Sequence, residues 1–118
     1  MVIQAEKQSL PANVLLLVSN LNALITVKLE ASNYSIWRSQ IQNFFEATEL
    51  FGFLDGSTAC PSATMLDSDH NTVSNPEFLQ WKLTDSCLLS CIIATLTPSI
   101  FSSILHLKNC CAVWSAFE

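Results

Sequence analysis

Residues 33–48, NYSIWRSQIQNFFEAT, carry the clearest helical pattern of this chain. Ser32 or Asn33 can act as the N-cap, because a short polar side chain there can accept a hydrogen bond from a free backbone N–H of the first turn. Apolar side chains then recur at helical spacing: Trp37, Ile41, Phe44, Phe45 and the methyl of Thr48. Polar side chains fall opposite: Arg38, Gln42, Glu46 and Glu49. The pattern predicts an amphipathic helix that inserts Trp37 into a core.

This helix is expected to end at Gly52 and the turn signal Asp55-Gly56. Residues 57–74 follow, and they are rich in Ser, Thr, Asp and Asn. Loops of that length are uncommon in compact domains and are usually either functional or mobile. We therefore expect a long loop at residues 57–74.

The next helix has a complete start signal. Asn75 can cap it, Pro76 suits the first helical position because its missing N–H is not needed there, and Glu77 favours the positive end of the helix dipole. The first half of the predicted helix is amphipathic, with Trp81 on its apolar side and Asp85 on its polar side.

The second half of this helix, residues 87–96, is apolar on nearly every side. We expect it to form the centre of the core, with Leu88 and Ile92 among the buried side chains. Thr97 and Pro98 repeat the combination of cap and proline, so a break and a third helix that ends at Asn109 are predicted there. A fourth helical pattern, which contains Trp114, is cut off at Glu118.

The beginning of the chain is less decided. Residues 1–12 show no periodic pattern, and we interpret them as a flexible leader. A short helix fits residues 14–21, and an extended piece fits residues 26–29 equally well. The predicted fold is therefore all-α, a helical domain of residues 13–118 with about four helices, the last one truncated, and a short extended segment near the N-terminus left open.

Composition limits the classes of function. The chain has 118 residues, half of them hydrophobic, and ten acidic residues against five basic ones give a net charge of −5. Binding to nucleic acid depends on Lys and Arg that displace counterions, so direct nucleic-acid binding by this segment is disfavoured. No stretch reaches the roughly twenty apolar residues of a spanning helix, and no secretory signal is evident. We expect an intracellular, cytoplasmic protein that does not bind membranes.

The cysteines and histidines allow metal-binding or catalytic interpretations as well as simpler ones. Cys87 and Cys91 lie four residues apart, and His106 and Cys110 share that spacing, yet a closed zinc site usually contains a tight Cys-x-x-Cys pair. Buried core thiols explain these cysteines better. His70 lies near two aspartates in the long loop, but nothing holds such a group in a catalytic geometry. We predict that this chain is not an enzyme and that it binds no metal and no cofactor.

The three tryptophans, Trp37, Trp81 and Trp114, allow two interpretations. Aromatic rings can stack on single-stranded bases, but this mode works together with a basic groove, which the sequence does not supply. A large ring on the inner face of a helix buries much area, and its indole N–H then needs one partner. We therefore expect all three rings to belong to the core.

Short sequence words occur in a recognisable order. The first are Val27-Lys28-Leu29, Asn33-Tyr34, Trp37-Arg38 and Leu50-Phe51-Gly52-Phe53-Leu54-Asp55-Gly56. Those downstream are Pro61, Asn75-Pro76-Glu77-Phe78, Gln80-Trp81-Lys82, Asp85, Leu88-Leu89-Ser90, Thr97-Pro98-Ser99, Val113-Trp114 and Phe117-Glu118. From about residue 14 to its end, the chain resembles the N-terminal Gag region of plant Copia-type LTR retrotransposon polyproteins.

The resemblance implies an all-helical, capsid-like region that multimerises around element RNA, with RNA capture assigned to a downstream Cys/His zinc knuckle. The leading hypothesis is thus a non-enzymatic module that associates with itself. One alternative is a free-standing helical adaptor, or a degenerate remnant, that binds another protein through exposed apolar surface. A second alternative is a Cys/His metal protein. The residues expected in the family motif and the core are Tyr34, Trp37, Phe44, Phe53, Trp81, Leu88, Ile92 and Trp114. The predicted helix caps are Asn33, Asn75, Pro76, Thr97 and Pro98.

Overall fold

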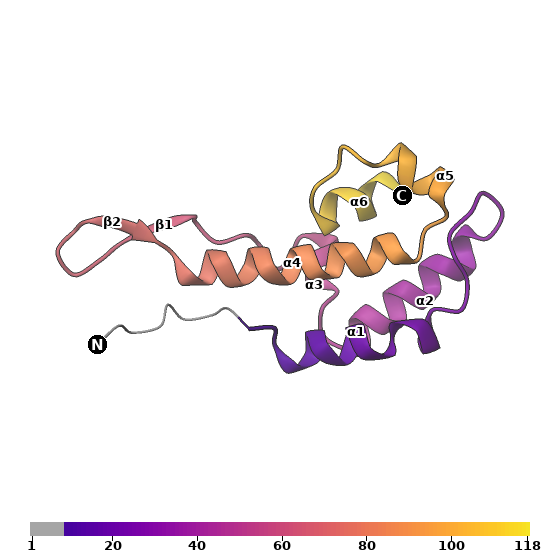
Figure 1. The fold of residues 1–118 in the computed structure, drawn as a ribbon, viewed down its shortest axis with the longest axis horizontal. Coiled ribbons are helices and arrows are strands. Elements are labelled where there is room, and N and C mark those ends of the chain that lie inside the picture. The colour runs from indigo at the N-terminus through magenta and orange to yellow at the C-terminus, as the bar shows by residue number, and fades with distance from the viewer. Residues whose placement is uncertain (1–8) are drawn as a thin grey trace.

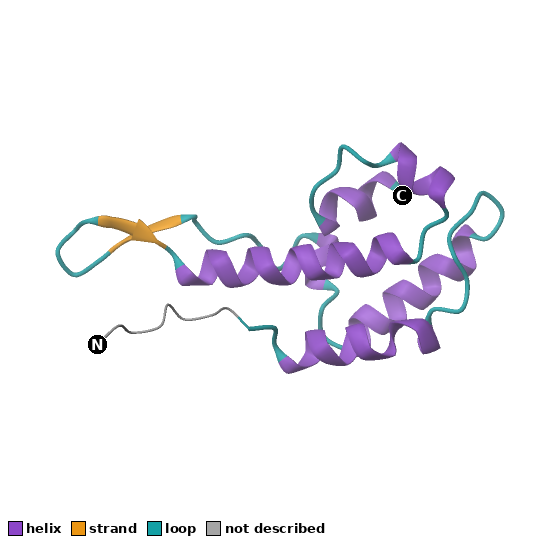
Figure 2. Ribbon diagram, in the orientation of Figure 1, coloured by secondary structure: helices purple, strands orange, loops and turns teal. Residues whose placement is uncertain are grey.

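The computed structural model describes residues 9–118, which form six helices and one small β-hairpin. Helix α4 (Pro76–Ala94) runs through the middle, with α1 (Ala12–Leu24) and α2 (Tyr34–Ala47) on one side and α5 (Pro98–Ser103) and α6 (Cys110–Ala116) on the other (Figure 1). The longest dimension is 56 Å, because the hairpin and the first half of α4 project from the body (Figure 2). The predicted helical fold class is confirmed.

The undecided segment after the leader forms α1, a helix of 13 residues. Residues 1–8 of the predicted leader lie outside the described residues. Pro11 occupies the N-cap position, and its carbonyl accepts hydrogen bonds from the N–H groups of Val14 and Leu15. The extended alternative applies further on, where Leu29 forms an isolated parallel bridge with Leu96.

Helix α2 ends earlier than its sequence pattern predicts. The helix stops at Ala47, because Glu49 adopts a left-handed backbone conformation with φ of 61° and the N–H of Leu50 donates to the carbonyl of Phe45. This is the bond of a Schellman-type helix end, here with a glutamate where glycine is usual. A separate short helix, α3 (Gly52–Asp55), then ends at Gly56, whose φ of 87° suits a glycine.

The segment expected to be a long loop contains the hairpin. Strands β1 (Thr64–Leu66) and β2 (Thr72–Ser74) pair antiparallel, with Met65 opposite Val73, and all six residues are exposed. The Oδ1 atom of Asp67 accepts hydrogen bonds from the N–H groups of Asp69 and Asn71 at 2.9 Å, so this carboxylate shapes the turn. His70 sits in the turn with φ of 63°.

Helix α5 is shorter than predicted. It ends at Ser103, and His106 therefore does not share a helical face with Cys110, which begins α6. The Oδ1 atom of Asn109 accepts a hydrogen bond from the N–H of Ala112 and caps α6. The predicted third helix is thus too long, and residues 104–109 form the connection to α6.

The core lies where α1, α2, α4 and α6 meet. Helix α6 packs on α3 and α4, and α1 packs on α2 and α4. The largest side chains that are fully buried are Trp37, Trp114, Phe45, Leu17, Ile41, Leu54, Leu88 and Ile92. The assignment of Asp85 to the polar side of α4 is wrong, since this residue is only 1% exposed.

Asp85 is buried because α6 supplies a partner for it. Its Oδ1 accepts a hydrogen bond from the backbone N–H of Cys110 at 3.2 Å, and the Cys110 thiol donates to the Asp85 carbonyl at 3.3 Å. Its other oxygen, Oδ2, has no hydrogen-bond partner among the described residues. A carboxylate is favoured near the first N–H groups of a helix, and this contact fastens α6 to α4.

Candidate functional site

An aromatic cluster connects α2, α4 and α6. Trp37 is fully buried, and its indole N–H donates to the hydroxyl of Thr95 at 2.9 Å. Its ring lies 5.9 Å from the ring of Trp114 and 5.5 Å from that of Phe117, the latter edge to face. Such pairs contribute about 0.5–1.5 kcal/mol each beyond area burial. The cluster thus fixes three elements that are far apart in the sequence.

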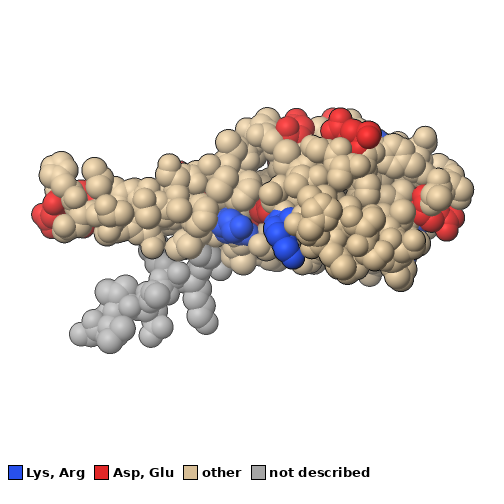
Figure 3. Space-filling view, turned by 90° about the horizontal axis from the view of Figure 1, so that it is seen from above, with Lys and Arg blue, Asp and Glu red and all other residues tan. Residues whose placement is uncertain are grey.

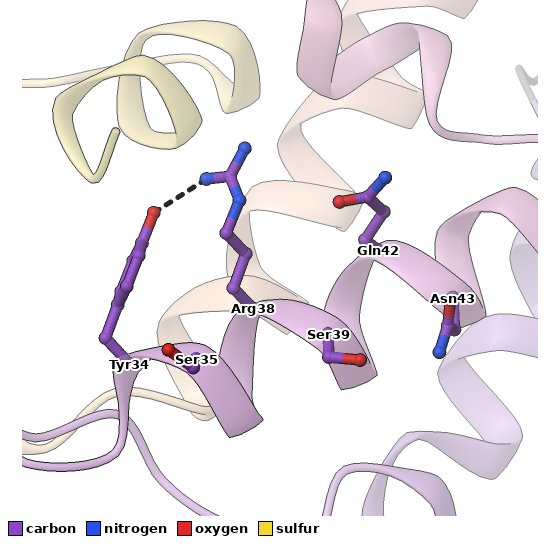
Figure 4. A pocket seen from close by; sticks show the side chains of 6 residues that line it. All are labelled: Tyr34, Ser35, Arg38, Ser39, Gln42 and Asn43. Atoms are coloured by element: carbon purple, nitrogen blue, oxygen red, sulfur yellow. Dashed lines mark hydrogen bonds between the residues drawn. The ribbon is translucent and has the colours of Figure 1, made fainter.

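Arg38 covers the outer side of this cluster. Its guanidinium lies 4.2 Å from the centre of the Trp114 ring and donates to the Tyr34 hydroxyl at 2.7 Å. Figure 4 shows Tyr34, Arg38 and Gln42 on the same side of α2, with the guanidinium directed toward α6. The prediction that Arg38 belongs to the solvent side of α2 is therefore incomplete, because its charge stacks on a buried ring.

A shallow groove of about 420 Å³ lies along α2 beside this arginine. Its lining residues are Tyr34, Ser35, Arg38, Ser39, Gln42 and Asn43. These six side chains offer hydrogen-bond donors and acceptors, but they include no carboxylate, imidazole or thiol that could act as a general base near neutral pH. The groove can hold a polar group, and it lacks the elements of a catalytic constellation.

Asn33 stands at the N-cap position of α2 without capping it. Its Oδ1 accepts a hydrogen bond from the N–H of Glu30, and its Nδ2 donates to the carbonyl of Lys28. The prediction that Asn33 caps α2 is therefore wrong, because both polar groups of its side chain bind the preceding loop. Leu29, in the same loop, exchanges backbone hydrogen bonds with Thr95 and Thr97. The loop before α2 is thus joined to the end of α4.

The other predicted caps occupy the starts of α4 and α5. The Oδ1 atom of Asn75 accepts a hydrogen bond from the N–H of Glu77 at 3.1 Å, and Pro76 is the first residue of α4. Pro98 is the first residue of α5. The hydroxyl of Thr97 does not cap that helix, since it donates to the Leu29 carbonyl at 2.8 Å.

Trp81 lies in a different environment from the other two tryptophans. It is only partly buried, packs against Phe53 with ring centres 5.6 Å apart, and donates its indole N–H to the carbonyl of Thr58. The prediction that Trp81 belongs to the core is therefore wrong. Its ring forms part of the wall of a groove of about 440 Å³. Pro61 lines this groove with Trp81, and Glu49 and Glu77 place carboxylates on it.

The remaining residues expected in the core differ in burial. Phe44, Leu88, Ile92 and Trp114 are buried, whereas Tyr34 and Phe53 are partly exposed. Because Trp37 and Trp114 are no more than 2% exposed, their faces are not accessible to a nucleobase. The interpretation of these two rings as stacking platforms therefore has no surface to act through.

All five cysteines are free thiols. Burial and the neighbouring Cys87 raise the pKa of Cys91 to about 11. Burial, followed by the effect of Asp85, raises the pKa of the Cys110 thiol as well. A raised pKa keeps a thiol protonated and unreactive. Across residues 9–118, no group of three or more His, Cys, Asp or Glu is arranged to hold a metal ion.

Helix α1 leaves apolar side chains uncovered. Its exposed large apolar residues are Leu15, Leu16, Val18 and Leu24, between 42% and 55% exposed. The hairpin exposes three more, Met65, Leu66 and Val73. Apolar patches of this kind mark contact sites more often than isolated leucines do. In the part of the chain that the structure describes, no helix is long and apolar enough to cross a membrane.

Comparison with known proteins identifies a family. Residues 22–62 match the Gag-polypeptide family of LTR copia-type elements. Two Arabidopsis thaliana proteins, the Retrovirus-related Pol polyproteins from transposons RE1 and RE2, are each 31% identical to this chain over 101 residues. The matched region covers 86% of this chain and only 7% of each polyprotein. No solved structure matches the chain.

Proposed function

This chain belongs with the Gag region of copia-type LTR retrotransposon polyproteins, and from that premise we propose that it is a non-enzymatic structural module that associates with itself. The observation that carries the proposal is the uncovered apolar surface of α1 in a chain of which only 13% is charged. Apolar surface left by the fold is stabilised when another molecule covers it.

The absence of a catalytic pattern in the described pockets supports the non-enzymatic part of the proposal. The groove beside Arg38 contains no group suited to proton transfer near pH 7. In the groove beside Trp81, the ionisable residues are Glu49 and Glu77. Neither groove combines a nucleophile with a base within hydrogen-bonding reach, which an acyl or phosphoryl transfer site needs.

We also propose that this segment does not bind nucleic acid directly. Figure 3 shows a face on which uncharged side chains dominate, with acidic groups at the hairpin tip and few basic ones. Acidic residues outnumber basic ones by ten to five in the sequence. A surface with this balance repels phosphate and releases few counterions on binding.

The experiment for self-association is sedimentation velocity on the 118-residue chain in reducing buffer, at concentrations from about 1 µM to 1 mM, where contacts of micromolar to millimolar strength become populated. We expect the weight-average mass to rise with concentration. A mass that stays at that of one chain throughout this range contradicts the proposal, and it favours the alternative of a monomeric adaptor.

For that alternative, the groove beside Trp81 is the relevant observation. Its apolar wall of Phe53, Pro61 and Trp81, flanked by two carboxylates, would suit a basic segment of a partner. The two functions are separated by one measurement, because an adaptor remains monomeric by itself, whereas an assembling module does not.

A further inference from the structure

Helix α1 carries no charged residue on any side, although the fold covers only one of its faces. Its sequence, ANVLLLVSNLNAL, contains no charged residue. Val14, Leu17 and Leu21 are buried against the body. The outer face carries Leu15, Leu16 and Val18, which are 51%, 55% and 42% exposed. Figure 1 shows α1 at the edge of the molecule, with α2 and α4 on one side of it only.

A helix that presents no charged residue to solvent is unusual at the surface of a protein. Most surface helices bear charged residues toward solvent, and α2 does so with Glu46 on its exposed side. In α1, the exposed polar positions are filled by Ser19 and Asn22, which are small and neutral. The outer face of α1, defined here as residues 12, 15, 16, 18, 19, 22 and 23, therefore has the composition of a contact surface.

We propose that this outer face pairs with the same face of a second copy, across a two-fold axis, and that this pairing is a contact used in the proposed self-association. The second copy follows from the proposed self-association, and charge indicates where two copies can meet. The chain carries a net charge of −5, so two copies repel wherever acidic surfaces meet. The outer face of α1 lets them approach without opposing charges on this helix.

The spacing of large and small residues suits an antiparallel pair. The large residues Leu15, Leu16 and Val18 lie in the N-terminal half of the face, and the smaller residues Ser19, Asn22 and Ala23 follow in its C-terminal half, all of them exposed. When two such helices cross antiparallel about a point near Val18, the leucines of one copy lie opposite the small residues of the other. Large side chains of one helix then fill the spaces over small side chains of the other.

The exposed apolar residues of the hairpin are a weaker choice for the same role. Met65, Leu66 and Val73 belong to the two strands, and the turn that joins these strands contains Asp67 and Asp69. Pairing two hairpins would bring the aspartates of both copies together in a chain that is already acidic. Like charges that face each other across strands are destabilising.

The expected contact is weak. Helix α1 has 13 residues and is about 20 Å long, so a pair buries less surface than a standard stable interface of about 800 Å² per partner. We expect a dissociation constant between about 1 µM and 1 mM. Weak contacts suit an assembly in which each copy makes several of them at once.

The test uses sedimentation velocity on the full chain and on two variants with matched substitutions. Leu15→Asp places a charge on the outer face, and Leu105→Asp places the same charge at a leucine of nearly equal exposure, 54% against 51%, after α5. Both variants change the net charge equally. We expect Leu15→Asp to raise the dissociation constant at least about tenfold, because an unpaired charge would be buried twice in a two-fold contact. Leu105→Asp should leave it unchanged.

Each outcome decides a different point. Association of the unmodified chain with equal effects of the two substitutions overturns the α1 contact, and leaves self-association standing. A chain that is monomeric throughout overturns both. Far-UV circular dichroism confirms that each variant is folded. If Leu15→Asp is unfolded, the pair Leu15→Ser and Leu105→Ser replaces it, and an equal effect of these two also rejects the contact.

Salt provides an independent measurement. Raising the ionic strength from about 0.05 M to 0.5 M screens the repulsion between two acidic copies and does not weaken apolar contacts. We expect the dissociation constant of the unmodified chain to fall or stay constant over this range. A rise by tenfold would indicate a contact made by ion pairs, which the outer face of α1 cannot form.

Discussion

Trp37 and Trp81 lie near opposite ends of α4 and in opposite environments. At the aromatic end, which comprises the cluster of Trp37, Trp114, Phe117 and Thr95, the ring of Trp37 is fully buried and its N–H binds a buried hydroxyl. At the hairpin end, which comprises residues 57–83, the ring of Trp81 is partly exposed and its N–H binds a loop carbonyl. The same residue type thus serves a core at one end and a surface wall at the other.

The number of covering elements explains the difference. Trp37 on α2 contacts the ring of Trp114 on α6, and it bonds Thr95 directly after α4. Trp81 has one aromatic partner, Phe53, while the hairpin beyond it exposes every strand residue. A two-stranded hairpin without a packed face is marginally stable in water. Stability should therefore be concentrated at the aromatic end, with the hairpin end opening more easily.

Thiol modification should show this contrast most strongly. Cys60 at the hairpin end is exposed, whereas Cys110 is fully buried beside Asp85 and its raised pKa disfavours the reactive thiolate. We expect Cys60 to react with iodoacetamide roughly a thousandfold faster than Cys110 at pH 8, since a buried thiol reacts through openings that approach global unfolding. Mass spectrometry of digested samples over time measures both rates.

Denaturant provides the control for this measurement. In about 6 M guanidinium chloride the pKa difference and the burial both disappear, so the two rates should converge. Equal rates in native buffer would contradict the comparison, because they would mean that α6 separates from α4 as readily as the loop near Cys60 moves.

Truncation of each tryptophan tests the same contrast in free energy. Trp37→Ala should lower the free energy of unfolding by about 3–5 kcal/mol, as removal of large buried aromatic rings does. Trp81→Ala should cost about 1–2 kcal/mol, because part of its ring is already in contact with water. Urea denaturation followed by circular dichroism measures both. Equal costs for the two variants would show that the hairpin end contributes as much to stability as the aromatic end.

Local signals in the sequence predicted much of the aromatic end. Trp37 and Ile41 follow a helical spacing within α2, and Pro76 marks the start of α4, so both elements were predicted from residues close together in the chain. Such signals depend on backbone geometry that neighbouring residues determine. The fold class followed from the same patterns.

Interactions between distant residues explain what the sequence did not reveal. The sequence pattern predicts Asp85 on the solvent side of α4, but Asp85 is buried because it binds the N–H of Cys110 on another helix. The pattern of α2 predicts Arg38 on the polar side of the helix, and it does not show that the guanidinium stacks on the ring of Trp114. The sequence of α1 shows which of its residues are apolar, but only the packing of α1 on α2 and α4 shows that Leu15 and Leu16 are uncovered.

Replacing Thr95 by valine examines the polar contact of the Trp37 indole inside the aromatic end. Thr95→Val keeps the shape of the side chain and leaves the buried indole N–H of Trp37 without an acceptor. The Ile92 carbonyl loses the Thr95 hydroxyl as a donor but keeps the N–H of residue 95. We expect a loss of about 1–3 kcal/mol, the cost of an unsatisfied buried donor. Thr97→Val is the matched control, because the Leu29 carbonyl that its hydroxyl binds still accepts the N–H of residue 97. If Thr97→Val lowers the free energy of unfolding more than Thr95→Val does, the contact of Thr97 with Leu29 contributes more to stability than the contact of Thr95 with Trp37.

The smallest expected effect concerns Asn75, which joins the hairpin to α4. Its Oδ1 accepts the N–H of Glu77, and its Nδ2 donates to the carbonyl of Ser62 at 2.9 Å. Asn75→Ala removes both bonds and should cost about 1 kcal/mol, as losses of N-caps do. Asn75→Asp keeps an acceptor for the cap and removes only the bond to Ser62, so it should cost less. Hydrogen exchange then shows where the loss falls: amides of residues 62–79 should exchange faster in Asn75→Ala, while those around Trp37 keep their protection. Faster exchange at both ends would mean that the molecule opens as one unit, and the contrast between its two tryptophans would then describe packing alone.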